Sequence, residues 1–164
     1  MAIKLPDPFH QILNIAYKMR GFRIMEAYID KRDYNNVAYE GTKDLREYLE
    51  LDDQDSVCDC FCKVSINGEG EKGILFEDKK TKHSRDMFTA KKQLETTHKH
   101  LIGKNKNVDY AIISNVQLES SFEARTMANY PVKVLFSAIN SKQIHLENIK
   151  NLKGEKIPLL YHKG

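Results

Sequence analysis

The sequence predicts an α/β fold in which helices flank a mixed central β-sheet. Two stretches of the chain lead to this class. Residues 57–78 read as two strands joined by a glycine-rich turn, which predicts an antiparallel hairpin. Residues 85–138 then alternate helix, strand, helix and strand, a pattern typical of parallel strands joined by crossover helices. A sheet with both kinds of pairing is mixed, and its crossover helices cover its faces.

The composition is that of a globular protein. The chain has 164 residues, of which 41% are hydrophobic and 30% charged, and we expect residues 1–164 to form a single domain. No apolar run approaches the ~18–20 residues that span a bilayer, and the N-terminus lacks the apolar core of a secretory signal. Three cysteines crowded into residues 58–62 cannot form a disulfide framework. We therefore expect an intracellular, cytoplasmic protein that does not interact with membranes.

The first third of the chain predicts two helices and a strand. Asp7 is a good helix N-cap and Pro8 suits the first helical position, so a helix should begin at residue 9. The apolar positions that follow share one helical face and are Phe9, Ile12, Leu13 and Ala16. Residues 22–29 read as a strand and residues 30–36 as a loop. Thr42 is expected to cap a short helix. The apolar side of that helix is formed by Leu45, Tyr48 and Leu49.

The middle of the chain predicts the hairpin. Residues 57–66 alternate between two faces, as the side chains of a strand do. One face carries Cys58, Cys60, Cys62, Val64 and Ile66. The opposite face carries Val57, Asp59, Phe61 and Lys63. Residues 67–72 predict a turn, and the partner strand begins at residue 73.

The rest of the chain predicts further helices and strands in alternation. A helix over residues 85–102 has a sheet-facing side formed by Met87, Ala90, Leu94, Thr97 and Leu101. Later elements are expected as a strand at 108–114, a helix at 118–129, a strand at 132–138 and a final strand or hairpin near 156–161.

The net charge of +3 hides two segments of opposite sign. Residues 26–59 contain eleven acidic and four basic residues, whereas residues 79–106 contain nine basic and two acidic ones. One interpretation is two solvated faces of opposite charge. The other is an anion-binding surface, suited to nucleic acid, beside a site that holds cations.

Three short motifs favour structural roles. Gly68, Gly70 and Gly73 fit a dinucleotide-binding pattern, but a strand follows them instead of the helix that would bind phosphate, so a hairpin turn is the better interpretation. The alternating cysteines would spread their sulfurs over about 13 Å along a strand, too far for one tetrahedral zinc, which favours buried apolar roles over a metal sensor. His98 and His100 diverge on a helix and are expected to extend the basic surface.

The hairpin brings together residues with catalytic chemistry. Asp59 lies in the middle of the first predicted strand, and Glu77 and Lys79 close its partner. Two neighbouring carboxylates repel each other unless they share a cation, and Mg²⁺ prefers such oxygen ligands. A lysine beside that metal can orient a water molecule and stabilise developing negative charge, which suits phosphodiester hydrolysis.

At these residues the sequence resembles the PD-(D/E)XK nuclease superfamily, which includes Holliday junction resolvases and many DNA-repair nucleases. The apolar strand ending in Glu77-Asp78-Lys79 is similar to the family's E-x-K strand, and Asp59 falls at the position of the family's metal-binding aspartate. The helix and strand over residues 9–29, and the helix that carries Gln93, match the order of the family's elements. The resemblance extends to residue 138 and implies a restriction-endonuclease-like core.

The resemblance implies a Mg²⁺- or Mn²⁺-dependent endonuclease, with DNA as the expected substrate. Asp59 and Glu77 would bind the metal, Lys79 would position the attacking water or stabilise the transition state, and Gln93 would support the site. Sequence-independent phosphate contacts are expected from Lys80, Lys82, Arg85, Lys91, Lys92 and Lys99. Homodimers are common in the family, so the resemblance also allows a homodimer.

Two departures from the family pattern support a second hypothesis. Cys58 stands where many members have proline, and the first helix has no glutamate, although many active members carry an additional carboxylate there. These departures favour a catalytically inactive nuclease-fold module that binds nucleic acid or a protein partner. Asp55 is a rival to Asp59 as the metal ligand, although the alternation of the strand favours Asp59.

Overall fold

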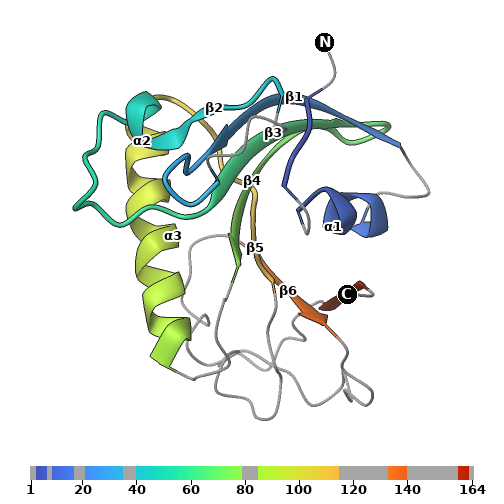
Figure 1. The fold of residues 1–164 in the computed structure, drawn as a ribbon. Coiled ribbons are helices and arrows are strands. Elements are labelled where there is room, and N and C mark those ends of the chain that lie inside the picture. Colours follow the sequence, from blue (N-terminus) through green and yellow to red (C-terminus); the bar gives the residue numbers. More distant parts are fainter. Residues whose placement is uncertain are drawn as a thin grey trace.

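One mixed β-sheet organises the chain in the computed structural model, which describes residues 3–6, 9–16, 21–34, 40–78, 85–114, 133–139 and 159–162. The described elements, in chain order, are α1 (Phe9–Ala16), β1 (Phe22–Ile29), β2 (Lys43–Asp44), α2 (Leu45–Tyr48), β3 (Cys60–Ile66), β4 (Gly70–Asp78), α3 (Arg85–Gly103), β5 (Tyr110–Ser114), β6 (Lys133–Ile139) and β7 (Leu159–His162). In the described part of the chain the sheet has seven strands in the order β2-β1-β3-β4-β5-β6-β7 (Figure 1).

The pairing of the strands changes at β4. Strands β1, β3 and β4 form an antiparallel meander, and the predicted hairpin is confirmed, with a register running from Cys60↔Phe76 to Ile66↔Gly70. From β4 onward, β5, β6 and β7 pair in parallel, and so do β1 and β2. The carboxyl end of β4 therefore lies beside the start of β3 and beside the carboxyl end of β5. Such switch points of a sheet are common places for binding sites.

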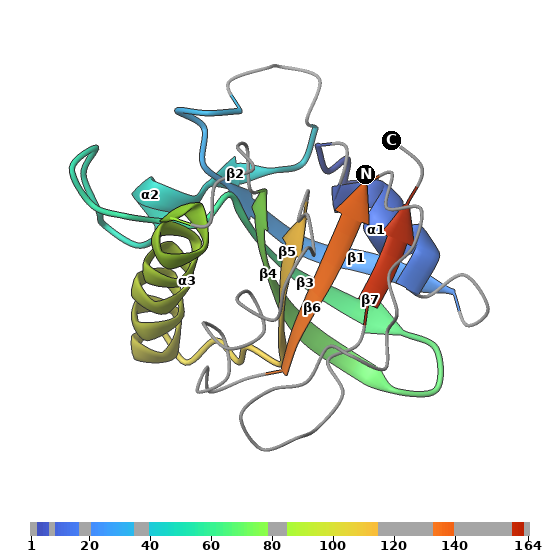
Figure 2. The same ribbon diagram turned by 90° about the horizontal axis from the view of Figure 1, so that it is seen from below.

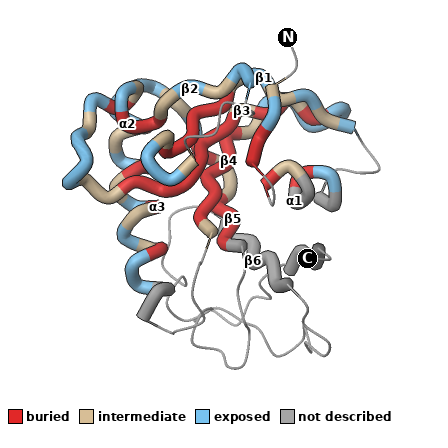
Figure 3. The backbone as a smooth tube through the Cα atoms, in the orientation of Figure 1, coloured by how far each residue is buried: buried red, intermediate tan, exposed pale blue. Residues whose placement is uncertain are grey.

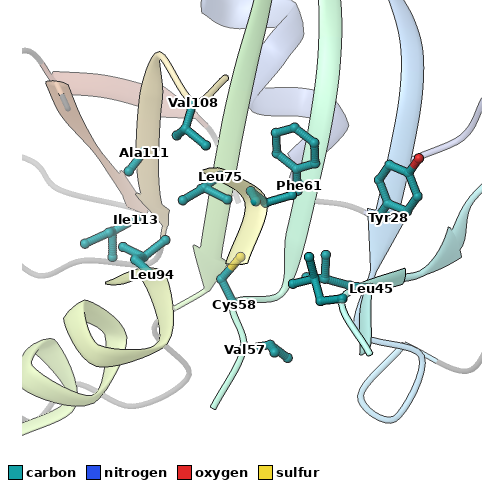
Figure 4. Close-up of a cluster of buried hydrophobic side chains, with 12 residues drawn as sticks. Tyr28, Leu45, Val57, Cys58, Phe61, Leu75, Leu94, Val108, Ala111 and Ile113 are labelled. Atoms are coloured by element: carbon teal, nitrogen blue, oxygen red, sulfur yellow. The ribbon is translucent and has the colours of Figure 1, made fainter. Parts of the chain in front are cut away.

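Helices cover both faces of the sheet, which confirms the α/β class. Helix α3 lies on one face and α1 on the other (Figures 1 and 2). The α3 side is filled by a buried cluster that includes Phe61, Leu75, Leu94 and Leu101 (Figure 4). The α1 side is filled by a second cluster that includes Phe9, Leu13, Cys60, Cys62 and Phe76. The central strands β3, β4 and β5 are consequently buried along most of their described length (Figure 3).

The segment before β3 differs from the prediction. The ladder with β4 begins at Cys60, not at Val57, and Cys58 packs with Val57 in the cluster on the α3 side instead of sharing a face with Cys60. The reason is a contact with the helix, because the backbone N–H of Cys58 donates a hydrogen bond to the Thr97 hydroxyl at 2.8 Å. The alternation expected over residues 57–66 therefore holds only from Cys60 onward.

The other corrections are local. The short helix α2 is capped by Asp44, whose carboxylate accepts a hydrogen bond from the N–H of Arg46, and not by Thr42. The hairpin turn covers only residues 67–69, and positive φ angles at Gly68 and Gly70 show why this turn needs glycine. Strand β4 thus starts three residues before the predicted position.

The helix expected over residues 118–129 lies outside the described residues. Within the part of the chain that the structure describes, no helix combines the length and the apolar character needed to cross a membrane.

Candidate functional site

Asp59 is fixed at the junction of three strands. Its backbone N–H donates to the carbonyl of Phe76 on β4 at 3.1 Å, and its carbonyl accepts from the N–H of Asp30, just beyond β1, at 3.0 Å. The residue is 2% exposed, and Oδ2 accepts a hydrogen bond from the N–H of Asp78 at 2.7 Å. The backbone and the carboxylate of Asp59 are therefore both held by neighbouring strands.

Glu77 lies beside Asp59 near the end of β4. It is 5% exposed, and its Oε2 atom is buried without a hydrogen-bond partner among the described residues. Removal from water raises the pKa of Glu77 well above its ordinary value, and the charge of Asp59 and a hydrogen bond between the two carboxyl groups raise it further. Glu77 therefore favours its protonated form more strongly than an exposed glutamate does.

A second carboxylate, in the middle of β1, shows how unusual this environment is. Glu26 on β1 contacts Lys106 Nζ at 3.0 Å and accepts a hydrogen bond from the Tyr28 hydroxyl at 2.9 Å. Its partial burial alone would raise its pKa, but these hydrogen bonds and the nearby lysine charges lower it. Glu77 has no comparable cationic partner among the described residues.

The Asp59–Glu77 pair fits a divalent cation. An orphaned, buried carboxylate oxygen next to a second carboxylate is what a hard cation would neutralise. The described residues contain no group of three or more His, Cys, Asp or Glu side chains that could hold a metal. Mg²⁺, however, is commonly held by one or two carboxylates, with water and substrate phosphate oxygens completing its coordination.

Tyr34 lies on the α1 side of the carboxyl pair. Its ring packs against Phe9, with ring centroids 5.9 Å apart, and Phe9 packs in turn against Phe76, the residue before Glu77. Burial raises the pKa of the Tyr34 phenol, and the charges of Asp59 and other nearby carboxylates raise it further. The Tyr34 hydroxyl is therefore held in its neutral form.

Asp55, the rival ligand, has a different role. Its Oδ2 accepts a hydrogen bond from the N–H of Asp52 at 3.0 Å and so closes a turn in the loop before β3. The structure thus places Asp59, and not Asp55, beside Glu77.

The remaining predicted site residues divide into described and undescribed ones. Lys79, Lys80 and Lys82 lie outside the described residues, and α3 begins at Arg85, whose side chain also lies outside them. Gln93 is half-buried on α3, and its backbone carbonyl accepts a hydrogen bond from the Thr97 hydroxyl at 2.8 Å. No described hydrogen bond joins its side chain to Asp59 or Glu77.

The basic side chains of α3 are available to a ligand to different degrees. Lys92 and Lys99 are exposed, whereas Lys91 is half-buried and lies 3.9 Å from Glu95 one turn along the helix. Burial lowers the pKa of His98, which reduces its charge near neutral pH. Lys92 and Lys99 are thus the strongest described candidates for phosphate contacts.

The cysteines are structural in the described structure. All three are buried free thiols, and Cys60 and Cys62 belong to the cluster on the α1 side. Burial raises the pKa of the Cys58 thiol well above its ordinary value, and the charge of Glu77 adds to this effect. Protonated, buried thiols are poor metal ligands, which favours the apolar interpretation.

Sequence reasoning placed Thr97 on the sheet-facing side of its helix but did not find its contact with Cys58, and it did not single out Tyr34 or Arg46. All three contact segments far from them in sequence, so no local spacing marks these contacts. The family models, curated proteins and solved structures compared with the chain contain no match to it.

Proposed function

We propose that the protein is a Mg²⁺-dependent nuclease of the PD-(D/E)XK type that hydrolyses phosphodiester bonds in DNA. The observation that carries the proposal is the buried pair of Asp59 and Glu77, in which Oε2 of Glu77 has no hydrogen-bond partner among the described residues. The order of elements supports it, because α1, β1, the β3–β4 hairpin, α3 and β5 follow the order implied by the family resemblance. A restriction-endonuclease-like core is part of the same proposal.

Asp59 and Glu77 would hold Mg²⁺ or Mn²⁺ at the carboxyl end of β4. The cation would polarise the scissile phosphate and offset negative charge in the transition state. Lys79 would orient the attacking water or stabilise the phosphorane-like charge, and Gln93 would support the site from α3. Water adds to phosphorus, the bond to the leaving oxygen breaks, and that oxygen takes up a proton.

Helix α3 would contact the DNA backbone. Lys92 and Lys99 are exposed on it, and the helix follows directly after the segment that holds Lys79, Lys80 and Lys82. Contacts of this kind recognise phosphates and carry no sequence information. The proposal therefore places the substrate where it contacts both the carboxyl pair and the exposed lysines of α3.

A cleavage assay with three substitutions tests the proposal. With Mg²⁺ present, we expect the wild-type protein to cut DNA, and Asp59→Asn and Lys79→Ala to lose cleavage while keeping the fold seen by circular dichroism. Asp53→Asn changes an exposed aspartate in the loop before β3 and should cut like the wild type. Unchanged cleavage by Asp59→Asn would overturn the assignment of the site.

The lack of a carboxylate on α1 favours a second candidate, a catalytically silent module with the same fold. The described helix α1 has the sequence FHQILNIA, which offers no additional acidic ligand. Salt-dependent DNA binding without cleavage under Mg²⁺ or Mn²⁺ would favour this candidate over the nuclease.

A further inference from the structure

We infer that Arg46 is a positioning residue for Asp59, acting through a buried ion pair with Asp30. The consequence of this inference for metal binding rests on the proposed function, whereas its geometry does not. It also gives a role to the acidic segment of residues 30–55, which the nuclease proposal leaves unexplained.

Arg46 and Asp30 form a buried, two-pronged ion pair. Arg46 is 5% exposed and Asp30 1% exposed. The Arg46 guanidinium contacts both carboxylate oxygens of Asp30, through Nε at 3.1 Å and through Nη2 at 3.4 Å. Such fork-to-fork geometry fixes the orientation of both side chains, which a lysine cannot reproduce.

The same guanidinium holds the loop that leads into Asp59. Arg46 Nη1 donates to the carbonyl of Asp52 at 2.6 Å and to the carbonyl of Asp55 at 2.7 Å. These residues belong to the loop that joins α2 to β3 (Figure 1). Arg46 therefore ties this loop to the end of β1, where Asp30 lies.

Both segments to which Arg46 donates hydrogen bonds border Asp59. The N–H of Asp30 donates to the carbonyl of Asp59 at 3.0 Å, and Asp59 itself follows the Arg46-bound loop, four residues after Asp55. The carbonyl of Asp30 also accepts hydrogen bonds from the N–H groups of Asp33 and Tyr34, which places Tyr34 on the α1 side of the site. A shift of Asp30 or of the loop would therefore displace the Asp59 carboxylate from Glu77.

The Arg46–Asp30 pair places two opposite charges together at a buried position. A lone arginine or aspartate buried here would be costly, whereas the pair keeps its charges and offers four directed hydrogen bonds. Groups that orient a metal ligand from behind commonly change metal affinity by about 10–100-fold when they are altered.

Amide hydrogen exchange on the metal-free protein tests the positioning directly. The reporter is the N–H of Asp78, which donates to Asp59 Oδ2 at 2.7 Å. The reference is the N–H of Asp109, which donates to the carbonyl of Gly73 at 2.7 Å in the half of the sheet far from the site. In Arg46→Lys we expect the Asp78 amide to exchange at least about tenfold faster relative to the Asp109 amide.

Two further variants control for folding and for the loss of any ion pair. Asp30→Asn keeps an oxygen acceptor for Arg46 while removing the charge, and it carries the test if Arg46→Lys does not fold. Lys106→Met removes the 3.0 Å contact with Glu26 and should leave the ratio of the two exchange rates unchanged. A purely structural role for Arg46 would accelerate both amides equally, which would overturn the inference.

Mn²⁺ titration calorimetry then separates this inference from the proposed function. If the site holds a cation, Arg46→Lys and Asp30→Asn should weaken Mn²⁺ binding about 10-fold or more, and Lys106→Met should stay within about twofold of the wild type. Wild-type protein that binds no Mn²⁺ would overturn the proposed function. In that case the ratio of the Asp78 and Asp109 exchange rates still tests whether Arg46 positions Asp59. Faster Asp78 exchange with unchanged Mn²⁺ affinity would overturn the link between Arg46 and the metal.

Discussion

Asp59 and Glu77 face each other in a place where neither carboxylate is well solvated. Among the described residues Glu77 has no cationic partner, whereas Glu26 is paired with Lys106, and a fold selected for stability alone would separate the two carboxyl groups or pair Glu77 in the same way. Functional sites commonly keep such unfavourable arrangements, because the ligand supplies the missing interaction. The free energy lost in the metal-free protein should return when a divalent cation binds.

Glu77→Gln should therefore stabilise the metal-free protein and destroy its response to metal. The substitution removes the charge and supplies an amide that can donate to Asp59, so we expect a gain on the order of 1 kcal/mol in the free energy of unfolding. Urea unfolding in EDTA and in Mg²⁺ measures both effects. Wild-type protein should gain stability from Mg²⁺ and the variant should not; a variant less stable than wild type in EDTA would contradict this explanation of Glu77.

The pH dependence of stability follows from the raised pKa of Glu77. Between its ordinary value of 4.5 and the higher pKa in the folded protein, the folded state binds more protons than the unfolded state. The contribution of Glu77 to the stability of the metal-free protein is therefore fully present below pH 4.5 and is lost as the pH rises through the folded pKa. Urea midpoints measured in EDTA across this range should show this loss in the wild type, and Glu77→Gln should remove it.

One buried hydroxyl joins helix α3 to the segment that leads into strand β3. Thr97 is fully buried, accepts a hydrogen bond from the N–H of Cys58, the residue before Asp59, and donates one to the carbonyl of Gln93. This link places the helix that carries the basic residues in a fixed position relative to the carboxyl pair.

Thr97→Val and Thr97→Ser separate this hydrogen bond from side-chain packing. Valine keeps the volume but leaves the Cys58 N–H buried without an acceptor, which should cost about 1–3 kcal/mol in the free energy of unfolding. Serine keeps the hydroxyl and removes one methyl group, which should cost about 1 kcal/mol. Urea unfolding measures both variants. A larger destabilisation by serine than by valine would show that packing, and not the hydrogen bond, holds α3 against the segment before β3.

Most strands and helices could be predicted because their patterns are local. The strand over Phe22–Ile29 was expected at those bounds, and the face of α3 that carries Ala90, Leu94, Thr97 and Leu101 is buried as expected. The two-residue strand β2 was not predicted, because its only signal is pairing with the distant end of β1. Local periodicity cannot report such pairing.

The candidate site likewise contains residues that could be predicted from the sequence and residues that could not. The neighbourhood of Asp59 and Glu77 could be predicted, since a hairpin register places their positions side by side. Thr97 and Arg46 could not, because they reach Cys58 and Asp30 across 39 and 16 residues of sequence. The predicted position of Cys58 was wrong for this reason, since its hydrogen bond with Thr97 takes it out of the strand's alternation.

Two segments of opposite charge, residues 26–59 and 79–106, lead into and out of the β3–β4 hairpin. Part of the acidic segment is neutralised internally by Arg46, and its last member is Asp59. The basic segment continues onto α3, where Lys92 and Lys99 are exposed. The two segments cancel in the net charge of +3, and in the proposed function the acidic one ends at the cation site while the basic one supplies the phosphate-binding helix.

The salt dependence of DNA binding tests the role of α3. Removing one lysine that binds a phosphate should reduce the slope of log K against log salt by about 0.9 for duplex DNA. Lys92→Ala and Lys99→Ala should each show this reduction in fluorescence anisotropy titrations. Lys72→Ala changes a lysine near the opposite end of β4 and should leave the slope unchanged. Equal slopes for all variants would place the DNA elsewhere on the molecule.

The claim that Asp59 and Glu77 together hold a divalent cation is tested most directly by anomalous diffraction from crystals soaked in Mn²⁺. We predict one anomalous peak within about 2–2.5 Å of a carboxylate oxygen of each residue. Saturating Mn²⁺ that leaves no anomalous peak between the two carboxyl groups would contradict it.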